Sequence, residues 1–73
     1  MILSQCKKSG NYIIMKIVAK KEDAIRLYRL GIKKGEKLYF AEKISGGGAL
    51  IEVLGSEIII GKTVCSQIVV ESA

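Results

Sequence analysis

The chain has 73 residues and a net charge of +5, with 49% of its residues hydrophobic and 5% aromatic. This length predicts one domain over residues 1–73, and the aliphatic composition favours β-structure. Because the chain has no His and no Asp besides Asp23, it lacks the usual groups for metal ligation, acid–base catalysis and nucleophile activation. We therefore expect a protein that is not an enzyme and that has no cofactor, no metal site and no catalytic residue.

The cysteine content and the hydropathy pattern indicate a compartment. Cys6 and Cys65 are too few for a secreted disulfide framework, and their spacing matches no zinc motif. No apolar run approaches the roughly eighteen residues that a membrane span requires, so we expect no direct membrane insertion. The simplest expectation is a cytoplasmic protein with reduced, partly buried thiols.

The first predicted strand covers residues 12–19. Ile13 and Met15 fall on one apolar face of this strand, while Lys16 marks the other face. By the same alternation, Ile14 is expected to point outward.

A short amphipathic helix is predicted within residues 23–36. Asp23 suits the N-cap position, and Gly31 suits the left-handed residue that ends a helix. Ile32 would then fold back on Leu27, as a Schellman end prefers.

One face of this helix must pack against a sheet, because a helix of about two turns is not stable alone in water. We assign Ala24, Leu27, Tyr28 and Gly31 to that face, and Leu30 to the core as well. The helix is therefore interpreted as a lid or plug, not as a free recognition helix.

The second predicted strand, residues 36–44, shows clear alternation. Leu38 and Phe40 share one face, and Tyr39 lies on the opposite face between lysines. We therefore expect Tyr39 to point outward.

The remaining elements are short. Residues 50–54 and 57–60 form an antiparallel hairpin, residues 62–66 form one helical turn, and residues 68–70 form a last strand that pairs with the first. The prediction is a mainly β chain with one short α-helix, in which about five antiparallel strands close into a small barrel. Closure would bury aliphatic side chains from every strand and remove exposed strand edges.

Residues 26–36, with the sequence RLYRLGIKKGE, resemble the FeoA family signature R-L-x-x-L-G-hydrophobic-x-x-G. Residues 3–10 and 51–55 resemble its opening turn and its late hairpin, so the similarity covers most of the chain. Two departures stand out: the chain has three glycines in the loop where family members often carry Pro, and Gly61 where they often carry a basic residue.

The resemblance implies an SH3-like barrel and a place in the bacterial ferrous iron transport system. It implies a non-enzymatic cytoplasmic accessory protein that binds and modulates a membrane transporter whose cytoplasmic part hydrolyses GTP. The transporter would carry out the chemistry and the ion movement. Related SH3-like domains also end metal-dependent transcriptional regulators, so the fold alone does not select the partner.

Two arginines of the helix are candidate partner contacts. Arg26 and Arg29 lie three residues apart, so both can project together and form forked hydrogen bonds with carboxylates of a partner. The alternative is a solvated face, in which Arg26 pairs with Glu22.

An aromatic residue and a glycine loop complete the candidate contact set. Tyr39 is the best single candidate for a hot spot, although an isolated exposed Tyr is about as often ordinary surface. The loop of Gly46, Gly47 and Gly48 is either mobile at its tip or shaped for the close approach of a partner.

Three other functions are weighed against the transporter partner. Nucleic-acid binding, as a regulator, is motivated by the charge of +5 and by Tyr39 between lysines. A weak homodimer would bring together outward aliphatic residues such as Ile14, Val18 and Leu54. Family association suggests transition metal ions, but the available ligands form no recognisable spacing. Those ligands are Cys6, Cys65, Glu52, Glu57 and Glu71.

Overall fold

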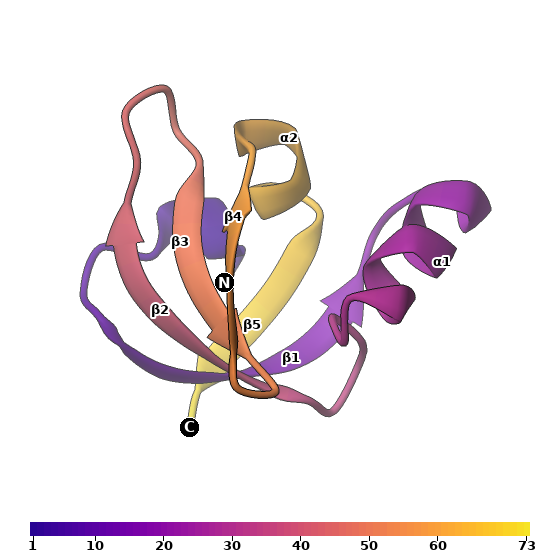
Figure 1. Ribbon diagram of the computed structural model, residues 1–73, viewed down its shortest axis with the longest axis horizontal. Helices are drawn as coiled ribbons and strands as arrows, with labels where there is room; N and C mark the ends of the chain where they lie inside the picture. Colours follow the sequence, from indigo (N-terminus) through magenta and orange to yellow (C-terminus); the bar gives the residue numbers. More distant parts are fainter.

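The computed structural model describes residues 1–73 as one antiparallel sheet with short helices (Figure 1). In chain order the elements are η1 (Leu3–Gln5), β1 (Gly10–Ile17), α1 (Lys21–Arg29), β2 (Lys37–Lys43), β3 (Ala49–Val53), β4 (Ser56–Ile60), α2 (Lys62–Cys65) and β5 (Ile68–Ser72). The sheet is strongly curled, and its strand order is β4-β3-β2-β1-β5. The predicted class, mainly β with five antiparallel strands and one short α-helix, is confirmed.

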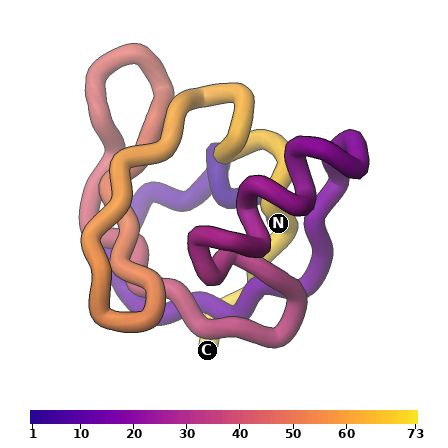
Figure 2. Tube along the Cα trace, turned by 45° about the vertical axis from the view of Figure 1, so that its right-hand side comes forward, coloured from indigo at the N-terminus to yellow at the C-terminus, as the bar shows by residue number.

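The hydrogen-bonded ring is not closed, because β4 and β5 end the sheet without pairing with each other. The α2 turn connects these two end strands in the chain. The α1 helix stands on the open side, between β4 and β1 (Figure 2). A cluster of fifteen buried hydrophobic residues, drawn from every strand, fills the inside of the curled sheet.

In β1, the structure reverses the predicted faces. Tyr12 and Ile14 are buried, whereas Met15 is 39% exposed, so the expectation that Ile14 points outward is wrong. The register of β1 against β5 shifts between Ile14 and Lys16, which is the signature of a β-bulge. The extra residue puts Ile14 and Ile17 on the same inner face. Alternation counted back from Lys16 across the bulge therefore assigns the residues before it to the wrong face.

In β2, the predicted alternation of Leu38, Tyr39 and Phe40 is confirmed, and β3 alternates in the same way. Leu38 and Phe40 of β2 are each 1% exposed, and Tyr39 between them points outward. On β3, Ile51 and Val53 are likewise buried. The edge of the Tyr12 ring packs against Phe40, with ring centroids 6.4 Å apart, which ties β1 to β2 inside the core.

The α1 helix begins earlier than the sequence suggests. Its N-cap is Lys20, with no side-chain cap, so the assignment of Asp23 as the N-cap is wrong. Asp23 instead lies in the first turn, where a negative charge interacts favourably with the helix dipole. Asp23, and not the predicted Glu22, forms the ion pair with Arg26, because the Arg26 guanidinium lies 3.9 Å from the Asp23 carboxylate.

The end of α1 is the predicted Schellman motif. Gly31 has φ of 88° and donates to the Tyr28 carbonyl at 3.0 Å, while Ile32 donates to the Leu27 carbonyl at 2.9 Å. Leu27 and Ile32 are both buried, as expected. Tyr28 and Leu30 are 61% and 47% exposed, so their assignment to the packed face and the core is wrong. The helix is only nine residues long, and Leu27 is its one buried residue.

Candidate functional site

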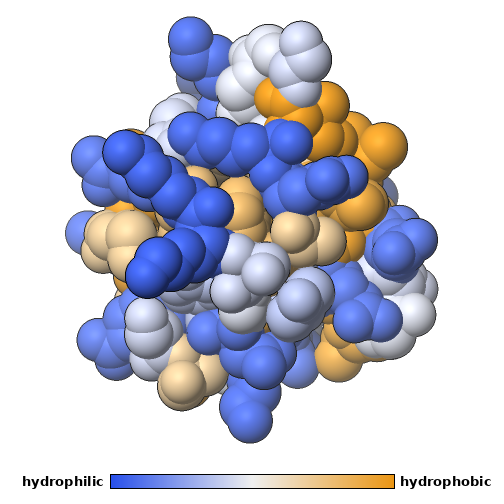
Figure 3. All heavy atoms as spheres, turned by 90° about the vertical axis from the view of Figure 1, so that its left-hand side faces the viewer, coloured by the Kyte–Doolittle hydropathy of each residue, from blue (hydrophilic) through white to orange (hydrophobic).

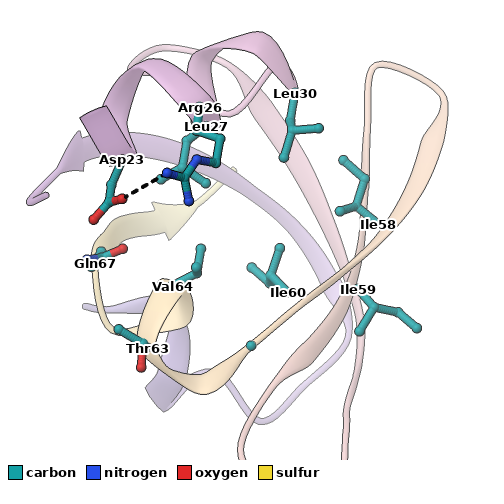
Figure 4. A pocket seen from close by; sticks show the side chains of 11 residues that line it. Asp23, Arg26, Leu27, Leu30, Ile58, Ile59, Ile60, Thr63, Val64 and Gln67 are labelled. Atoms are coloured by element: carbon teal, nitrogen blue, oxygen red, sulfur yellow. Dashed lines mark ion pairs between the residues drawn. The ribbon is translucent and has the colours of Figure 1, made fainter. Parts of the chain in front are cut away.

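A groove opens between α1, β4 and α2, on the unclosed side of the sheet (Figure 4). Its volume is about 400 Å³. The Schellman end leaves Leu30 over the groove, and the inward alternation of β4 directs Ile58 and Ile60 toward it. Its apolar lining residues are Leu27, Leu30, Ile58, Ile59, Ile60 and Val64, and its polar ones include Asp23, Arg26, Thr63 and Gln67.

The charged groups at the groove are weakly restrained. The side chain of Arg26 is 77% exposed, so its 3.9 Å contact with Asp23 contributes little to stability. Arg29 lies exposed in the last turn of α1. Further along, the Lys33 ammonium lies 4.9 Å from the centroid of the Tyr28 ring, a cation–π arrangement. The arginines are therefore available to a partner at little cost in free energy.

Tyr39 lies elsewhere, on the outer face of the sheet. Its cross-strand neighbours are Asn11 on β1 and Glu52 on β3. Together with Leu54 and Gly55 of the β3–β4 turn, these residues line a shallow hollow of about 250 Å³. Hydrophilic atoms dominate the molecular face that includes the β2–β3 side, and hydrophobic atoms gather toward its margin (Figure 3).

The glycine loop between β2 and β3 packs against the β4–α2 corner. A Cβ atom on Gly48 would lie 2.5 Å from the Ile60 carbonyl oxygen, so the backbone itself leaves no room for a side chain. At Gly47, φ is 97°, and a Cβ atom would meet the Lys62 side chain at 3.0 Å. Gly46 also has positive φ, at 94°, but open space around it. At Gly48, glycine is thus required by packing within the protein.

The candidate contact residues therefore lie in three places. Arg26 and Arg29 are on α1, Tyr39 is on the outer face of β2, and the glycine loop projects at the far side of the molecule from α1 (Figure 1). The sequence did not point to the groove, because its lining comes from three separate segments. The one sequence feature that could have indicated the groove is the run of three isoleucines at residues 58–60, because a short strand does not bury all three in the core.

Both thiols are internal. Cys6 and Cys65 are free and each 1% exposed. Burial raises the pKa of Cys6, opposed by a smaller effect of its hydrogen bond with Tyr12. Burial also raises the pKa of Cys65, and the charge of Cys6 adds to that increase. Neither thiol belongs to a group of three or more Cys, Asp or Glu side chains that could hold a metal ion.

The strongly curled sheet of five antiparallel strands is the architecture of a small SH3-like barrel. A model of the FeoA domain matches residues 1–72. The chain belongs to the FeoA family, a family of small non-catalytic domains associated with ferrous iron transport. None of its helices has the length and apolar character needed to cross a bilayer.

Solved structures agree with this assignment. ScaR, a manganese-activated repressor, in its form with bound Cd²⁺, is 27% identical with a TM-score of 0.90; the match covers 99% of this chain and 35% of ScaR. An iron uptake regulatory protein (FeoA) is 22% identical with a TM-score of 0.87, over 97% of this chain and 95% of that protein. The FeoA protein from Chlorobium tepidum is 22% identical with a TM-score of 0.86, and the match covers 99% of this chain and 70% of that protein. No curated protein matches the sequence.

This chain spans about a third of the length of ScaR. The likeness to the two FeoA structures, at 22% identity, concerns the fold.

Proposed function

We propose that this chain is a non-enzymatic cytoplasmic accessory protein of ferrous iron uptake, with residues 1–73 acting as one domain. It binds the GTP-hydrolysing ferrous iron transporter and modulates its activity. The observation that carries this proposal is the FeoA match over residues 1–72.

The contact surface that we propose centres on α1. Arg26 and Arg29 are exposed on the same helix, and two forked guanidinium groups can each bind a carboxylate of the partner. We assign secondary contacts to Tyr39 and to the loop of Gly46 and Gly47, while Gly48 keeps that loop against β4. Since these sites face different directions, one small partner surface would engage only a subset of them.

The test is an amide chemical-shift titration of isotope-labelled protein with the soluble GTP-binding part of the transporter from the same organism. We expect the largest shifts in α1 and its C-terminal turn. If the secondary contacts are used, smaller shifts should appear at Tyr39 or in the glycine loop. Arg26→Ala should weaken binding about three- to tenfold, the loss expected for one charge-assisted contact.

Lys21→Ala is the matched control, because Lys21 is also exposed on α1 but lies at its opposite end. An unchanged spectrum at saturating partner concentration would contradict the proposal for that part of the transporter. Equal effects of the two substitutions would instead assign the binding to overall charge.

A further inference from the structure

The two end strands of the sheet differ in what covers them. Along β5, the N-terminal residues act as a short extra strand: the Met1 ammonium donates to the Val70 carbonyl at 3.1 Å, Val70 donates to the Met1 carbonyl at 2.8 Å, and Ile2 bridges to Val69. Along the outer edge of β4 no segment of the chain is paired. The chain thus has one covered sheet edge and one open edge.

The open edge presents a defined set of backbone groups. The turn between β3 and β4 has two central residues with positive φ, Leu54 at 51° and Gly55 at 81°, and Val53 faces Ser56 across it. In such a hairpin the residues next to the turn are hydrogen-bonded to each other, and bonded and non-bonded pairs then alternate. The N–H and C=O groups of Glu57 and Ile59 therefore point away from β3. Neither residue makes a backbone hydrogen bond outside the regular elements.

The groove lies directly beside this edge. Ile58 and Ile60 of β4 point into the groove and form one of its walls, whereas the Ile59 side chain points away from it (Figure 4). Leu27 and Leu30 of α1 form the facing wall. Ile59 is 71% exposed, and β4 carries neither Pro nor Lys, two residues that often protect a strand edge; Glu57 is its only charged residue. A peptide that adds a strand to a sheet edge gains affinity from main-chain hydrogen bonds and specificity from pockets that take its alternate side chains. The unpaired backbone groups of β4 and the apolar groove beside them offer both.

Charge indicates what kind of strand this is. Arg26, whose side chain is 77% exposed, lines the groove beside its ion-pair partner Asp23. Lys62 does not line the groove, because its side chain lies against Gly47 of the β2–β3 loop. Across the whole chain, basic residues exceed acidic ones by five. A second copy would bring together two molecules of charge +5, whereas an acidic segment would be attracted.

We propose that the groove between β4 and α1 binds an extended segment of another protein as an additional strand along β4. The segment carries alternating aliphatic side chains, one of which enters the groove, and acidic residues at the end that meets Arg26. Its backbone pairs with Glu57 and Ile59. The identification of that protein as the transporter rests on the proposed function, whereas the mode of binding does not.

The first test uses a short synthetic peptide of alternating valine and threonine with glutamates at one end, added to the labelled full chain. Amide hydrogen exchange of Glu57 and Ile59 should slow at least tenfold on binding, while Ile58, already paired with β3, changes little. The same peptide with its pairing amides N-methylated keeps its side chains but loses donors, and should bind at least tenfold more weakly.

Protein variants provide the second test. Ile59→Pro removes an N–H group that β3 does not use, so it should weaken peptide binding at least tenfold. Ile59→Thr keeps the N–H group and the strand propensity, and is the matched control that should bind within threefold of the wild type. If Ile59→Pro unfolds the protein, the N-methylated peptide still decides the question on the wild-type chain.

Several results would overturn the proposal. Shifts in the groove side chains without new protection of Glu57 and Ile59 would mean that only a side chain docks. Equal binding of the methylated peptide, or no binding of either peptide at millimolar concentration, would exclude strand addition. Concentration-dependent protection of Ile59 in the protein alone would assign the edge to a second copy.

The same variants separate this inference from the proposed function. If the transporter part binds wild-type protein and Ile59→Pro equally well, the proposed function stands and strand addition to that partner fails. If the transporter part does not bind but the peptide does, the proposed function fails and the open edge remains a binding site.

Discussion

The two edges of this sheet have the same backbone chemistry but different surroundings. Strand β5 is covered by Met1 and Ile2, which are followed at once by the fully buried Leu3. Strand β4 is bordered by a groove and leaves Ile59 71% exposed. The fold therefore protects one edge with its own chain, and we infer that the other serves for binding.

The anchoring of the covered edge gives the largest expected effect. Leu3→Ala removes a fully buried side chain and should lower the free energy of unfolding by about 3 kcal/mol. Ile59→Ala, at the open edge, should change it by less than about 1 kcal/mol, because that side chain is mostly exposed. Urea unfolding of both variants measures the difference. Similar losses would mean that the two edges are equally packed.

The position of β4 depends on Gly48. Gly48→Ala places a Cβ atom 2.5 Å from the Ile60 carbonyl, so β4 or the loop must shift, at a cost of about 1–3 kcal/mol. Gly61→Ala is the control, because nothing lies within 4 Å of its Cβ position. Thermal unfolding of the two variants checks this. If Gly48→Ala is as stable as Gly61→Ala, the loop does not hold the open edge in place.

The two thiols give a smaller, pH-dependent effect on the free energy of unfolding. Cys6 directly follows η1 and Cys65 ends α2, and these two elements are in contact. Their pKa values are raised in the folded state, so the folded protein retains these protons longer than the unfolded chain. Their stabilising contribution is full below the ordinary thiol pKa of about 8.5 and is lost as pH rises through the folded pKa values. Unfolding free energies between neutral and alkaline pH measure it.

Cys6→Ala should reduce the alkaline slope even though it also lowers the stability at neutral pH. An unchanged slope in this variant would show that Cys6 does not titrate differently in the folded and unfolded states.

The smallest expected effect concerns nucleic acid. Nucleic-acid binding is the alternative function that the net charge suggested, and it stays untested by the structure. We expect no oligonucleotide binding at moderate salt, since the lysines are scattered over several elements. Fluorescence anisotropy with single-stranded oligonucleotides, from low to moderate salt, measures this. Tight binding that falls steeply with salt would favour a nucleic-acid function.

The sequence predicted the fold well where apolar and charged residues alternate. Leu38 and Phe40 share a face with no ambiguity, because Lys37 and Tyr39 alternate with them along the strand. The run Tyr12-Ile13-Ile14-Met15 has no such marker, and the β-bulge after Ile14 reverses the later residues. Periodicity cannot detect a bulge, since the extra residue is a property of the pairing with β5 and not of β1 alone.

The candidate site was only partly predictable. The Schellman end followed from Gly31 and Ile32, because that motif is local and depends on one left-handed residue. The groove did not follow, since it depends on the distance between α1 and β4, which tertiary packing sets. The exposure of Leu30 has the same origin, because Leu30 lies over this groove and is not packed against the sheet.

The difference between the two edges is tested most directly by amide hydrogen exchange in the free protein. We expect the amides of Ile59 and Glu57 to exchange close to the rate of an unprotected chain, while the amide of Val70, bonded to the Met1 carbonyl at 2.8 Å, exchanges slowly. Exchange of Ile59 as slow as that of Val70 would mean that β4 is already covered, and would contradict the open edge on which the account depends.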